Sequence, residues 1–175
     1  TMIFMQSHRT RRFIGRLDQG DRVVVALREL CLRHDIRCGE IRATGFLKDV
    51  VLDVFHHGQH RYRPVMLGPH VYQITSFAGN VSMLHSGDLV VHIHATLLPD
   101  LATGNSTLVG GRIQDADVLA LEFTIDTFDD FTLMRQPAAE TGFEQWVQLE
   151  LAPPDGRDTS GAVPASVSSP TPAEA

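Results

Sequence analysis

The chain has 175 residues, a formal net charge of −6 at pH 7, 43% hydrophobic residues and 21% charged residues. A chain of this length can bury a core as one domain, and this composition is ordinary for a globular protein. No apolar run reaches the roughly 18 residues that indicate a membrane span, which argues against an integral membrane protein.

The N-terminal stretch and the cysteines bear on the compartment. The stretch TMIFMQSHRTRR places its positive charges after a very short apolar patch, which is the wrong order for a secretory signal. Cys31 and Cys38 are the only cysteines, and two thiols with this spacing make neither a disulfide framework nor a zinc motif. We interpret both as reduced core or helix-end residues rather than a redox pair, and we expect a cytoplasmic protein.

Charges are unevenly distributed along the chain. Residues 1–48 carry ten Lys and Arg against five Asp and Glu, whereas the remainder carries five against sixteen. Such a basic N-terminal third could contact a phosphate backbone. Five of its arginines, however, alternate with acidic residues on or just after a predicted helix, which is typical of a solvated helix face. These five are Arg22, Arg28, Arg33, Arg37 and Arg42.

The first elements expected in chain order are a short strand from Phe13 and a helix over residues 21–35. The helix is predicted from one apolar stripe at i, i+3, i+4 and i+7 spacing. Asp21 is the expected N-cap, and Gly39 follows the helix end. The stripe consists of Val23, Ala26, Leu27, Leu30 and Cys31.

From residue 40 onward the apolar period changes from 3.6 to 2. Residues 40–57 predict two strands with a turn near residues 45–49, and residues 61–67 predict an edge strand because of Pro64. Residues 70–98 predict three strands, broken at residues 79–80 and 86–88; residues 99–107 predict a loop. Residues 117–128 predict a strand, and residues 143–151 a strand or short helix. We therefore expect an α+β fold, with one main helix packed on a largely antiparallel, mixed β-sheet.

The composition divides the chain into three segments. We expect a basic N-terminal arm over residues 1–12, a folded domain over residues 13–151 and a tail over residues 152–175. The tail is rich in Pro, Ser, Ala and Thr and has no apolar period. Such a segment cannot bury enough apolar surface to offset its ordering entropy, so we predict that it is disordered.

Two histidines in the stretch VVHIHATLL are the first candidate site residues. On a strand, His92 and His94 share one face while Val91 and Ile93 point to the other. Their backbones lie about 7 Å apart, a separation that two imidazoles can close onto one metal ion. A zinc ion requires a third protein ligand, which the local spacing does not supply. The alternative is a polar face of a half-exposed strand that carries two histidines by chance.

The neighbourhood of this strand resembles the plants-and-prokaryotes-conserved (PPC) domain family. The resemblance rests on the order of six stretches between about Phe13 and Leu151: LDQGDRVVVALRELCLRHDI, IRATGFLKDVVL, YQITSFAGNVS, VHIHATLLPD, LVGGRI and LALEFTI. In plants this domain follows AT-hook motifs, and in bacteria and archaea it usually stands alone. The resemblance implies a PPC-like fold and a stand-alone member of the bacterial type.

Stand-alone members of that family are expected to hold zinc with the two strand histidines and the histidine of a Gly-Gly-His phrase. His92 and His94 match, but Arg112 occupies the third position, and Gln73 stands where the family has a glutamate. A guanidinium offers donors and no lone pair, so it cannot ligate a cation, and its charge should lower the pKa of both imidazoles. We therefore expect a degenerate zinc site without a cofactor, with zinc as the alternative. A replacement ligand could come from His85, or from His56, His57 or His60.

Arg112 also suggests an anion site. Two neutral imidazoles and a guanidinium that follows Gly-Gly, where a ligand can approach the backbone, make such a pocket. The candidate pocket consists of His92, His94, Arg112 and Glu122. The alternative is that Arg112 forms a structural salt bridge with Glu122 or Asp126.

The function hypothesis follows from the resemblance. The plant relatives bind AT-rich DNA largely through the AT hook, whose Arg-Gly-Arg-Pro core this chain lacks; the basic stretch HRTRRFIGR is its best feature for DNA. No nucleophile, P-loop or dinucleotide motif is present, so an enzyme is not expected, although His92 and His94 could act as bases oriented by Glu122 or Asp126. We favour a DNA-binding or regulatory module with an unassigned ligand. The alternative is a protein that binds a small anion or a metal, or an enzyme, through the His92/His94/Arg112 pocket.

Self-association is the expected partnership. The resemblance implies a homotrimer built around a threefold axis. The sequence agrees for its own reasons, because one amphipathic helix can cover only part of an apolar sheet face. Closed symmetry would bury the remainder in every copy and leave no free sheet edge.

Overall fold

The computed structural model describes residues 2–100, 102, 104, 107–140 and 142–152. All but the first residue of the expected tail, 152–175, therefore lies outside the described residues. In chain order the elements are β1 (Arg12–Leu17), α1 (Val23–Arg33), β2 (Gly39–His56), the short 3-10 helix η1 (His57–Gln59), β3 (Arg61–Met66), β4 (Tyr72–Leu84), β5 (Leu89–Pro99), β6 (Val109–Thr127), β7 (Phe131–Pro137) and β8 (Glu144–Leu151).

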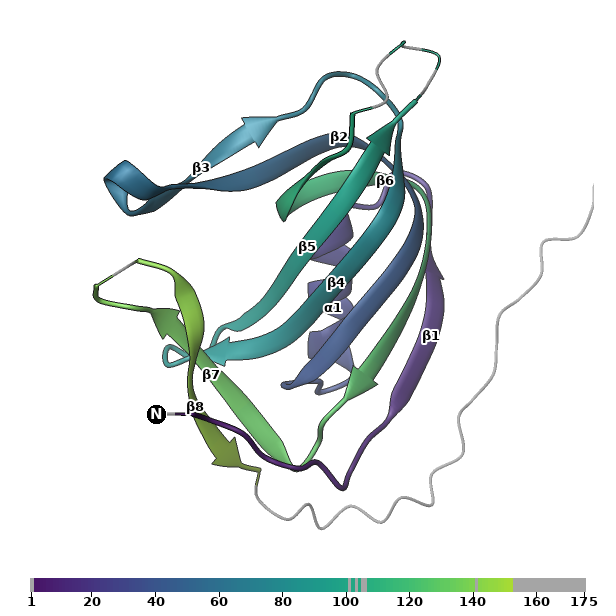
Figure 1. Cartoon of the computed structure of the whole chain (residues 1–175). Coiled ribbons are helices and arrows are strands. Elements are labelled where there is room, and N and C mark those ends of the chain that lie inside the picture. Colours follow the sequence, from purple (N-terminus) through teal and green to yellow (C-terminus); the bar gives the residue numbers. More distant parts are fainter. Residues whose placement is uncertain (1, 101, 103, 105–106, 141, 153–175) are drawn as a thin grey trace, which may run out of the picture.

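Four long strands form a closed circuit of hydrogen-bonded pairs. Strand β2 pairs with β6, β6 with β5, β5 with β4, and β4 returns to β2, each pair antiparallel (Figure 1). The shorter strands extend this circuit: β1 pairs with β6, β3 with β2, and the β7–β8 hairpin joins β4 through two parallel residue pairs. The sheet therefore has eight strands and strong curvature.

The expected α+β class is wrong, because the structure is mostly β. Strands account for 61% of the described residues and helices for 10%. The expected turn near residues 45–49 and the expected break at residues 79–80 both lie inside continuous strands, β2 and β4. At Gly45 (φ 137°) and Asp49 (φ 49°) the backbone turns to positive φ while pairing continues with shifted register. Irregularities of this kind bend a strand instead of ending it.

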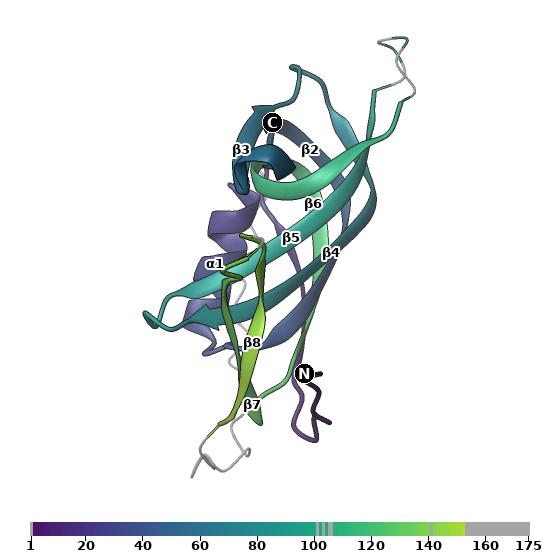
Figure 2. The ribbon, with the colours of Figure 1, turned by 60° about the vertical axis from the view of Figure 1, so that its left-hand side comes forward.

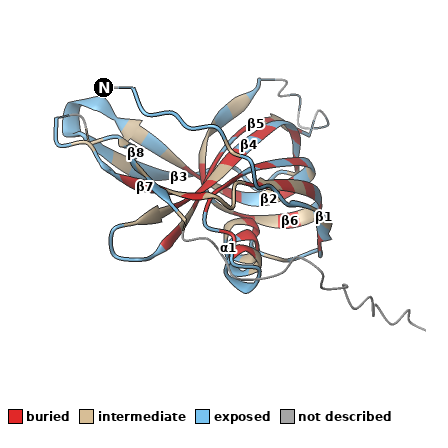
Figure 3. Cartoon of the chain, turned by 90° about the horizontal axis from the view of Figure 1, so that it is seen from below, coloured by how far each residue is buried: buried red, intermediate tan, exposed pale blue. Residues whose placement is uncertain are grey.

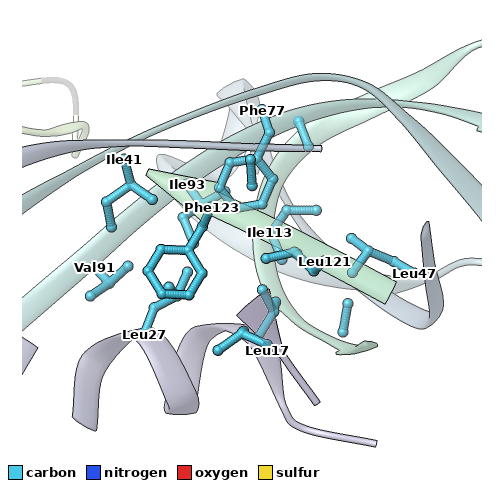
Figure 4. Close-up of a cluster of buried hydrophobic side chains, with 14 of the residues drawn as sticks. Leu17, Leu27, Ile41, Leu47, Phe77, Val91, Ile93, Ile113, Leu121 and Phe123 are labelled. Atoms are coloured by element: carbon cyan, nitrogen blue, oxygen red, sulfur yellow. The ribbon is translucent and has the colours of Figure 1, made fainter. Parts of the chain in front are cut away.

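The α-helix of the described residues, α1, covers one face of the curved sheet (Figure 2). Its Val23, Leu27 and Cys31 are fully buried, as the apolar stripe predicts. Figure 4 shows Leu27 pointing from the helix toward Phe123. Burial of this stripe is the main reason that an 11-residue helix is stable here.

The ends of α1 differ from expectation. The Asp21 carboxylate accepts a hydrogen bond from the Asp18 N–H instead of capping the helix. The N–H of Val24 instead donates to Asp115 Oδ1 of β6 at 3.2 Å, so a distant strand satisfies one of the free N–H groups of the first turn. At the other end Asp35 takes a left-handed conformation (φ 50°), and Gly39 is already the first residue of β2.

Both cysteines are buried and form no disulfide, as the sequence predicts. Burial raises the pKa of the Cys31 thiol to about 12 and that of the Cys38 thiol to about 12. Both thiols therefore stay protonated at neutral pH and serve as packing groups.

The sheet face away from α1 carries the polar side chains of the inner strands. Val91, Ile93 and Ala95 of β5 are buried in the core, whereas His92 and His94 alternate with them and face outward. Buried residues concentrate where α1 meets the sheet, whereas β3 and the β7–β8 hairpin are largely exposed or half-buried (Figure 3). In the described part of the chain, no helix combines the length and apolarity needed to cross a membrane.

Candidate functional site

The paired histidines of β5 form the centre of the candidate site. His92 Nε2 and His94 Nε2 lie 3.0 Å apart, with ring centroids separated by 5.0 Å. At this distance one ring donates its N–H and the other accepts it with a lone pair. His92 is 9% exposed although it faces away from the core, because the β7–β8 hairpin covers it.

Strand pairing brings Arg112 to the same place. Arg112 of β6 lies directly opposite His94 in the antiparallel register, so the two side chains emerge on one face. Its Nη1 lies 3.1 Å from Glu144 Oε2, and its Nε lies 3.9 Å from Asp53 Oδ2. The guanidinium carbon lies 5.0 Å from the centre of the Tyr62 ring. The structure thus brings His92, His94 and Arg112 together.

Glu122, the carboxylate expected in this pocket, lies elsewhere. It is ten residues beyond Arg112 on the same strand, which corresponds to about 30 Å. There it is exposed and pairs in register with Arg16 and Thr44. Asp126 lies further along β6 and binds Arg12 and Arg42.

Of the two carboxylates beside Arg112, the nearer is that of Glu144, the first residue of β8. Glu144 Oε2 lies 3.1 Å from Arg112 Nη1 and 3.9 Å from His92 Nδ1. It lies 32 positions after Arg112 in the sequence, and no local spacing connects the two. The one available signal is that residues 143–151 favour a strand. The register of that strand comes from its partner β7, which was not among the strands predicted from the sequence.

A second guanidinium, that of Arg135 on β7, is also part of the site, although it was not predicted from the sequence. Arg135 is 4% exposed, and its guanidinium donates to Ser82 Oγ (3.1 Å), to Asn80 Oδ1 (2.9 Å) and to the main-chain oxygen of Glu144 (3.0 Å). Asn80 and His92 lie opposite each other in the β4–β5 register. Arg135 therefore ties β8 to β4 beside the histidine pair.

Burial and the two guanidiniums keep the imidazoles neutral. The pKa of His92 is lowered to about 3, first by burial and then by the charges of Arg135, Arg112 and His94. The pKa of His94 is also lowered, first by burial and then by Arg112 and Arg135. The expected effect of Arg112 is present, but desolvation is the larger cause in both rings.

Two buried polar atoms at the site lack a hydrogen bond in the described structure: His92 Nδ1 and Glu144 Oε2. The 3.1 Å contact of Glu144 Oε2 with Arg112 is an ion pair whose angles do not meet hydrogen-bond geometry. An unpaired buried polar atom costs about 1–3 kcal/mol. A ligand, or a small movement of the side chain, that supplied the missing hydrogen bonds would therefore stabilise the site.

Two hairpins meet beside this cluster. The Phe55 ring at the end of β2 lies 4.2 Å from the Phe143 ring, just before β8. His57 of the β2–β3 turn packs edge-on against both phenylalanines, with centroids 5.3 and 6.0 Å away. Figure 1 shows both hairpins projecting from the same side of the sheet. His57 thus takes part in an aromatic contact between the hairpins, while His56 and His60 flank it in the turn and His85 lies exposed in the β4–β5 turn.

The basic N-terminal segment is docked along one end of the sheet. Ser7 Oγ and the His8 N–H donate to the Asp130 carboxylate, and Arg11 pairs with Asp129. Arg12 and Arg42 share Asp126. Arg22 of the expected solvated helix face pairs with Asp115 and Asp117. Much of the positive charge in the first third of the chain is therefore compensated by carboxylates of the acidic remainder.

The sequence profile of the Plants and Prokaryotes Conserved (PCC) domain matches residues 5–129, well over half of the chain. The chain belongs to this family. It is the family also abbreviated PPC, so the resemblance seen in the motifs is confirmed. Residues 130–152, which supply Arg135 and Glu144, lie beyond the matched segment of this PCC-domain protein.

Solved structures agree with the family assignment. The fold is similar to a PPC protein from Pyrococcus horikoshii, with 24% identity and a TM-score of 0.73 over 86% of this chain and 100% of that one. It is also similar to a metal-containing protein from Archaeoglobus fulgidus, with 25% identity and a TM-score of 0.75 over 84% and 100% of the two chains. A candidate DNA-binding protein from Bacteroides thetaiotaomicron shows 19% identity and a TM-score of 0.68 over 78% and 91%. No curated protein sequence matches the chain.

The residues of this PCC domain do not fit a zinc ion. The two Nε2 atoms converge as ligands of one ion would, but the residue opposite His94 is Arg112, which has only donors. A second guanidinium lies nearby, and Glu144 faces Nδ1 of His92 instead of the converging Nε2 atoms. Among the residues that the structure describes, no three of His, Cys, Asp and Glu are grouped as metal ligands.

Proposed function

We propose that this PCC-domain protein is a regulatory module that binds a small anion at the His92/His94/Arg112 cluster. The observation that carries the proposal is the convergence of Arg112 with two imidazoles that stay neutral at physiological pH. A guanidinium supplies charge and several donors, and a neutral imidazole supplies one N–H and one lone pair. This set suits a carboxylate or phosphate group better than it suits a cation.

The location of the cluster supports a binding role. It lies at the meeting point of β5, β6 and the β7–β8 hairpin, next to two buried atoms whose hydrogen-bonding capacity is unused. Arg112 and Arg135 add positive potential in a partly desolvated environment, where electrostatic interactions are stronger than in bulk water. In the alternative proposal, zinc replaces the anion. It would need a third ligand that the described donor set lacks.

DNA binding is the second candidate function. It is favoured by the two solved relatives described as candidate DNA-binding proteins, from Bacteroides thetaiotaomicron and Ralstonia eutropha. Against it, Arg11, Arg12, Arg22 and Arg42 are already paired with carboxylates. Counterion release, which drives binding to phosphate backbones, needs basic side chains that are free to approach the phosphates.

We also propose that the protein forms a homotrimer, that it is cytoplasmic, and that its folded domain spans residues 13–151 between a basic arm and a tail. A hollow of about 360 Å³ on the sheet surface supports an interface between copies; it is lined by the apolar Phe46, Val71, Leu98 and Pro99 and by the polar Gln73 and Asp100. Buried thiols support a reducing compartment. The folded domain over residues 13–151 is supported by ordered elements from β1 to β8.

Isothermal titration with inorganic phosphate tests the proposal. We expect the unaltered protein to bind phosphate, and we expect Arg112→Gln to abolish this binding while the fold, followed by circular dichroism, is retained. Arg37→Gln is the control, because it removes an exposed guanidinium paired with Asp35 on the protein surface. A parallel titration with duplex DNA at 50 and 200 mM salt separates the candidates. Micromolar DNA binding that weakens steeply with salt, without phosphate binding, would favour the second candidate.

A further inference from the structure

Glu144 contacts the same groups that the anion site offers to a ligand. Its Oε2 lies 3.1 Å from Arg112 Nη1 and 3.9 Å from His92 Nδ1, and this oxygen is buried. A carboxylate in this position interacts with the guanidinium and one imidazole of the cluster at once. It does so poorly, because neither Glu144 Oε2 nor His92 Nδ1 completes a hydrogen bond in the described structure.

The charges around the cluster are balanced only because Glu144 is there. The imidazoles of His92 and His94 are neutral at physiological pH, so the charged groups are Arg112 and Arg135 on one side and Glu144 and Asp53 on the other. Asp53 is the more distant of the two carboxylates, at 3.9 Å from Arg112 Nε. Removing the charge of Glu144 would leave one net positive charge in a half-buried environment. Such a charge is costly unless an anion accompanies it.

The backbone at Glu144 is anchored while its side chain retains a route to solvent. The main-chain oxygen of Glu144 accepts a hydrogen bond from Arg135 Nη1 at 3.0 Å, and its neighbour in the β7 register is Pro137. The side chain as a whole is 28% exposed although Oε2 is buried. A rotation about the side-chain bonds can therefore carry the carboxylate outward without displacing β8.

We propose that Glu144 is a built-in competitor that occupies the anion site and sets its affinity and specificity. An external anion binds Arg112 by taking the place of the Glu144 carboxylate, which turns toward solvent. This inference rests on the anion-binding function proposed above. A ligand can displace Glu144 only if it binds Arg112 more strongly than this carboxylate, whose hydrogen bonds are incomplete. A phosphate or phosphate monoester has more acceptor oxygens than a simple monocarboxylate, so it should compete more effectively.

The test compares affinities for inorganic phosphate and for acetate in the full-length protein by isothermal titration. Glu144→Gln keeps the size of the side chain and removes its charge, so we expect phosphate to bind about tenfold more tightly, as expected for one unfavourable charge near a partly buried site. Glu150→Gln is the matched control, because Glu150 lies exposed on the same strand, bonded to Gln148. We expect that variant to match the unaltered protein. Glu144→Asp withdraws the carboxylate by one methylene, so we expect its affinity for phosphate to lie between those of the unaltered protein and Glu144→Gln. It serves as the second variant if Glu144→Gln does not fold.

The outcomes separate this inference from the function on which it rests. If phosphate binds, Arg112→Gln abolishes binding, and Glu144→Gln or Glu144→Asp shows no gain, then Glu144 is no competitor while the anion site stands. If acetate binds as tightly as phosphate to Glu144→Gln, the proposed preference for phosphate is wrong. If neither anion binds to any variant, or Arg112→Gln leaves binding unchanged, the proposed function itself is overturned.

Discussion

His92 Nε2 and His94 Nε2 lie 3.0 Å apart on the outer face of β5, within hydrogen-bonding distance of each other. Only one of the two nitrogens can carry the hydrogen, so the pair is fixed as one donor and one acceptor. If His94 donates, the proton of His92 is on Nδ1, where the Glu144 carboxylate lies 3.9 Å away. The carboxylate therefore favours one tautomer of the pair.

The low pKa of His92 predicts a loss of stability on acidification. The unfolded chain takes up a proton at His92 near the ordinary pKa of 6.5, whereas the folded protein does so only near pH 3. The contribution of this group is therefore complete above about pH 6.5 and decreases as the pH falls from there toward 3. Urea unfolding between pH 7.5 and 4.5 should show a falling free energy of unfolding. In His92→Asn this fall should be shallower, and an equal slope in both proteins would contradict the assignment.

Arg112→His should create a zinc site. Position 112 lies opposite His94 in the β5–β6 register, so an imidazole there would join the two that already converge, and the guanidinium charge would be gone. Three neutral imidazoles are a sufficient protein ligand set for zinc. We expect about one zinc ion per chain by inductively coupled plasma mass spectrometry after dialysis against the metal. Arg112→Gln removes the same charge without adding a ligand, and equal zinc retention by that variant would show that charge alone excludes the metal.

Arg135 should be a strong determinant of stability. Its buried guanidinium satisfies Asn80 Oδ1, Ser82 Oγ and the Glu144 carbonyl, all of which would lose a partner in Arg135→Met. Losing hydrogen bonds from a buried charged group should lower the free energy of unfolding by about 3 kcal/mol. Arg37→Met, at an exposed ion pair with Asp35, should change it by less than about 0.5 kcal/mol. Chemical denaturation of the two variants measures both changes. An equal loss of unfolding free energy in the two variants would contradict the prediction.

Gly45 should tolerate no side chain. Its φ of 137° lies in the region that favours glycine, and a Cβ at this position would lie 2.0 Å from the Ala120 carbonyl oxygen of the neighbouring strand. Gly45→Ala should therefore lower the free energy of unfolding by about 2 kcal/mol or more. Gly58→Ala is the control, since its nearest contact would be the His56 ring at 3.5 Å. Similar melting temperatures for the two variants would contradict the close approach of β2 and β6.

The proposed trimer predicts a solution mass near three times the 19.3 kDa of one chain. Multi-angle light scattering at micromolar concentration measures it directly. Phe46, which is 41% exposed beside the hollow on the sheet surface, is the proposed contact residue, so Phe46→Glu should shift the mass toward the monomer by placing a charge in the interface. Val54→Glu, at an apolar position that is 46% exposed and lies outside the hollow, is the control. A monomeric unaltered protein would refute the trimer.

The sequence alone determined the features that depend on neighbours a few residues apart. The helical stripe of Val23, Leu27 and Cys31 is a local periodicity, and the structure buries all three. The common face of His92 and His94 follows from strand alternation, and the inability of Arg112 to ligate a cation follows from its chemistry. The family was identifiable because its motifs occur in a fixed order along the chain.

Only the tertiary structure decided the fold class and the composition of the site. Whether positive φ at Gly45 ends a strand or bends it depends on the strand alongside, and here β6 keeps β2 paired through the bend. Glu122 shares a strand with Arg112 yet lies far from it, because an extended strand separates residues in proportion to their spacing. Glu144 and Arg135 reach the site through the register of a hairpin with β4, and register between distant strands is set by long-range packing that no local pattern encodes.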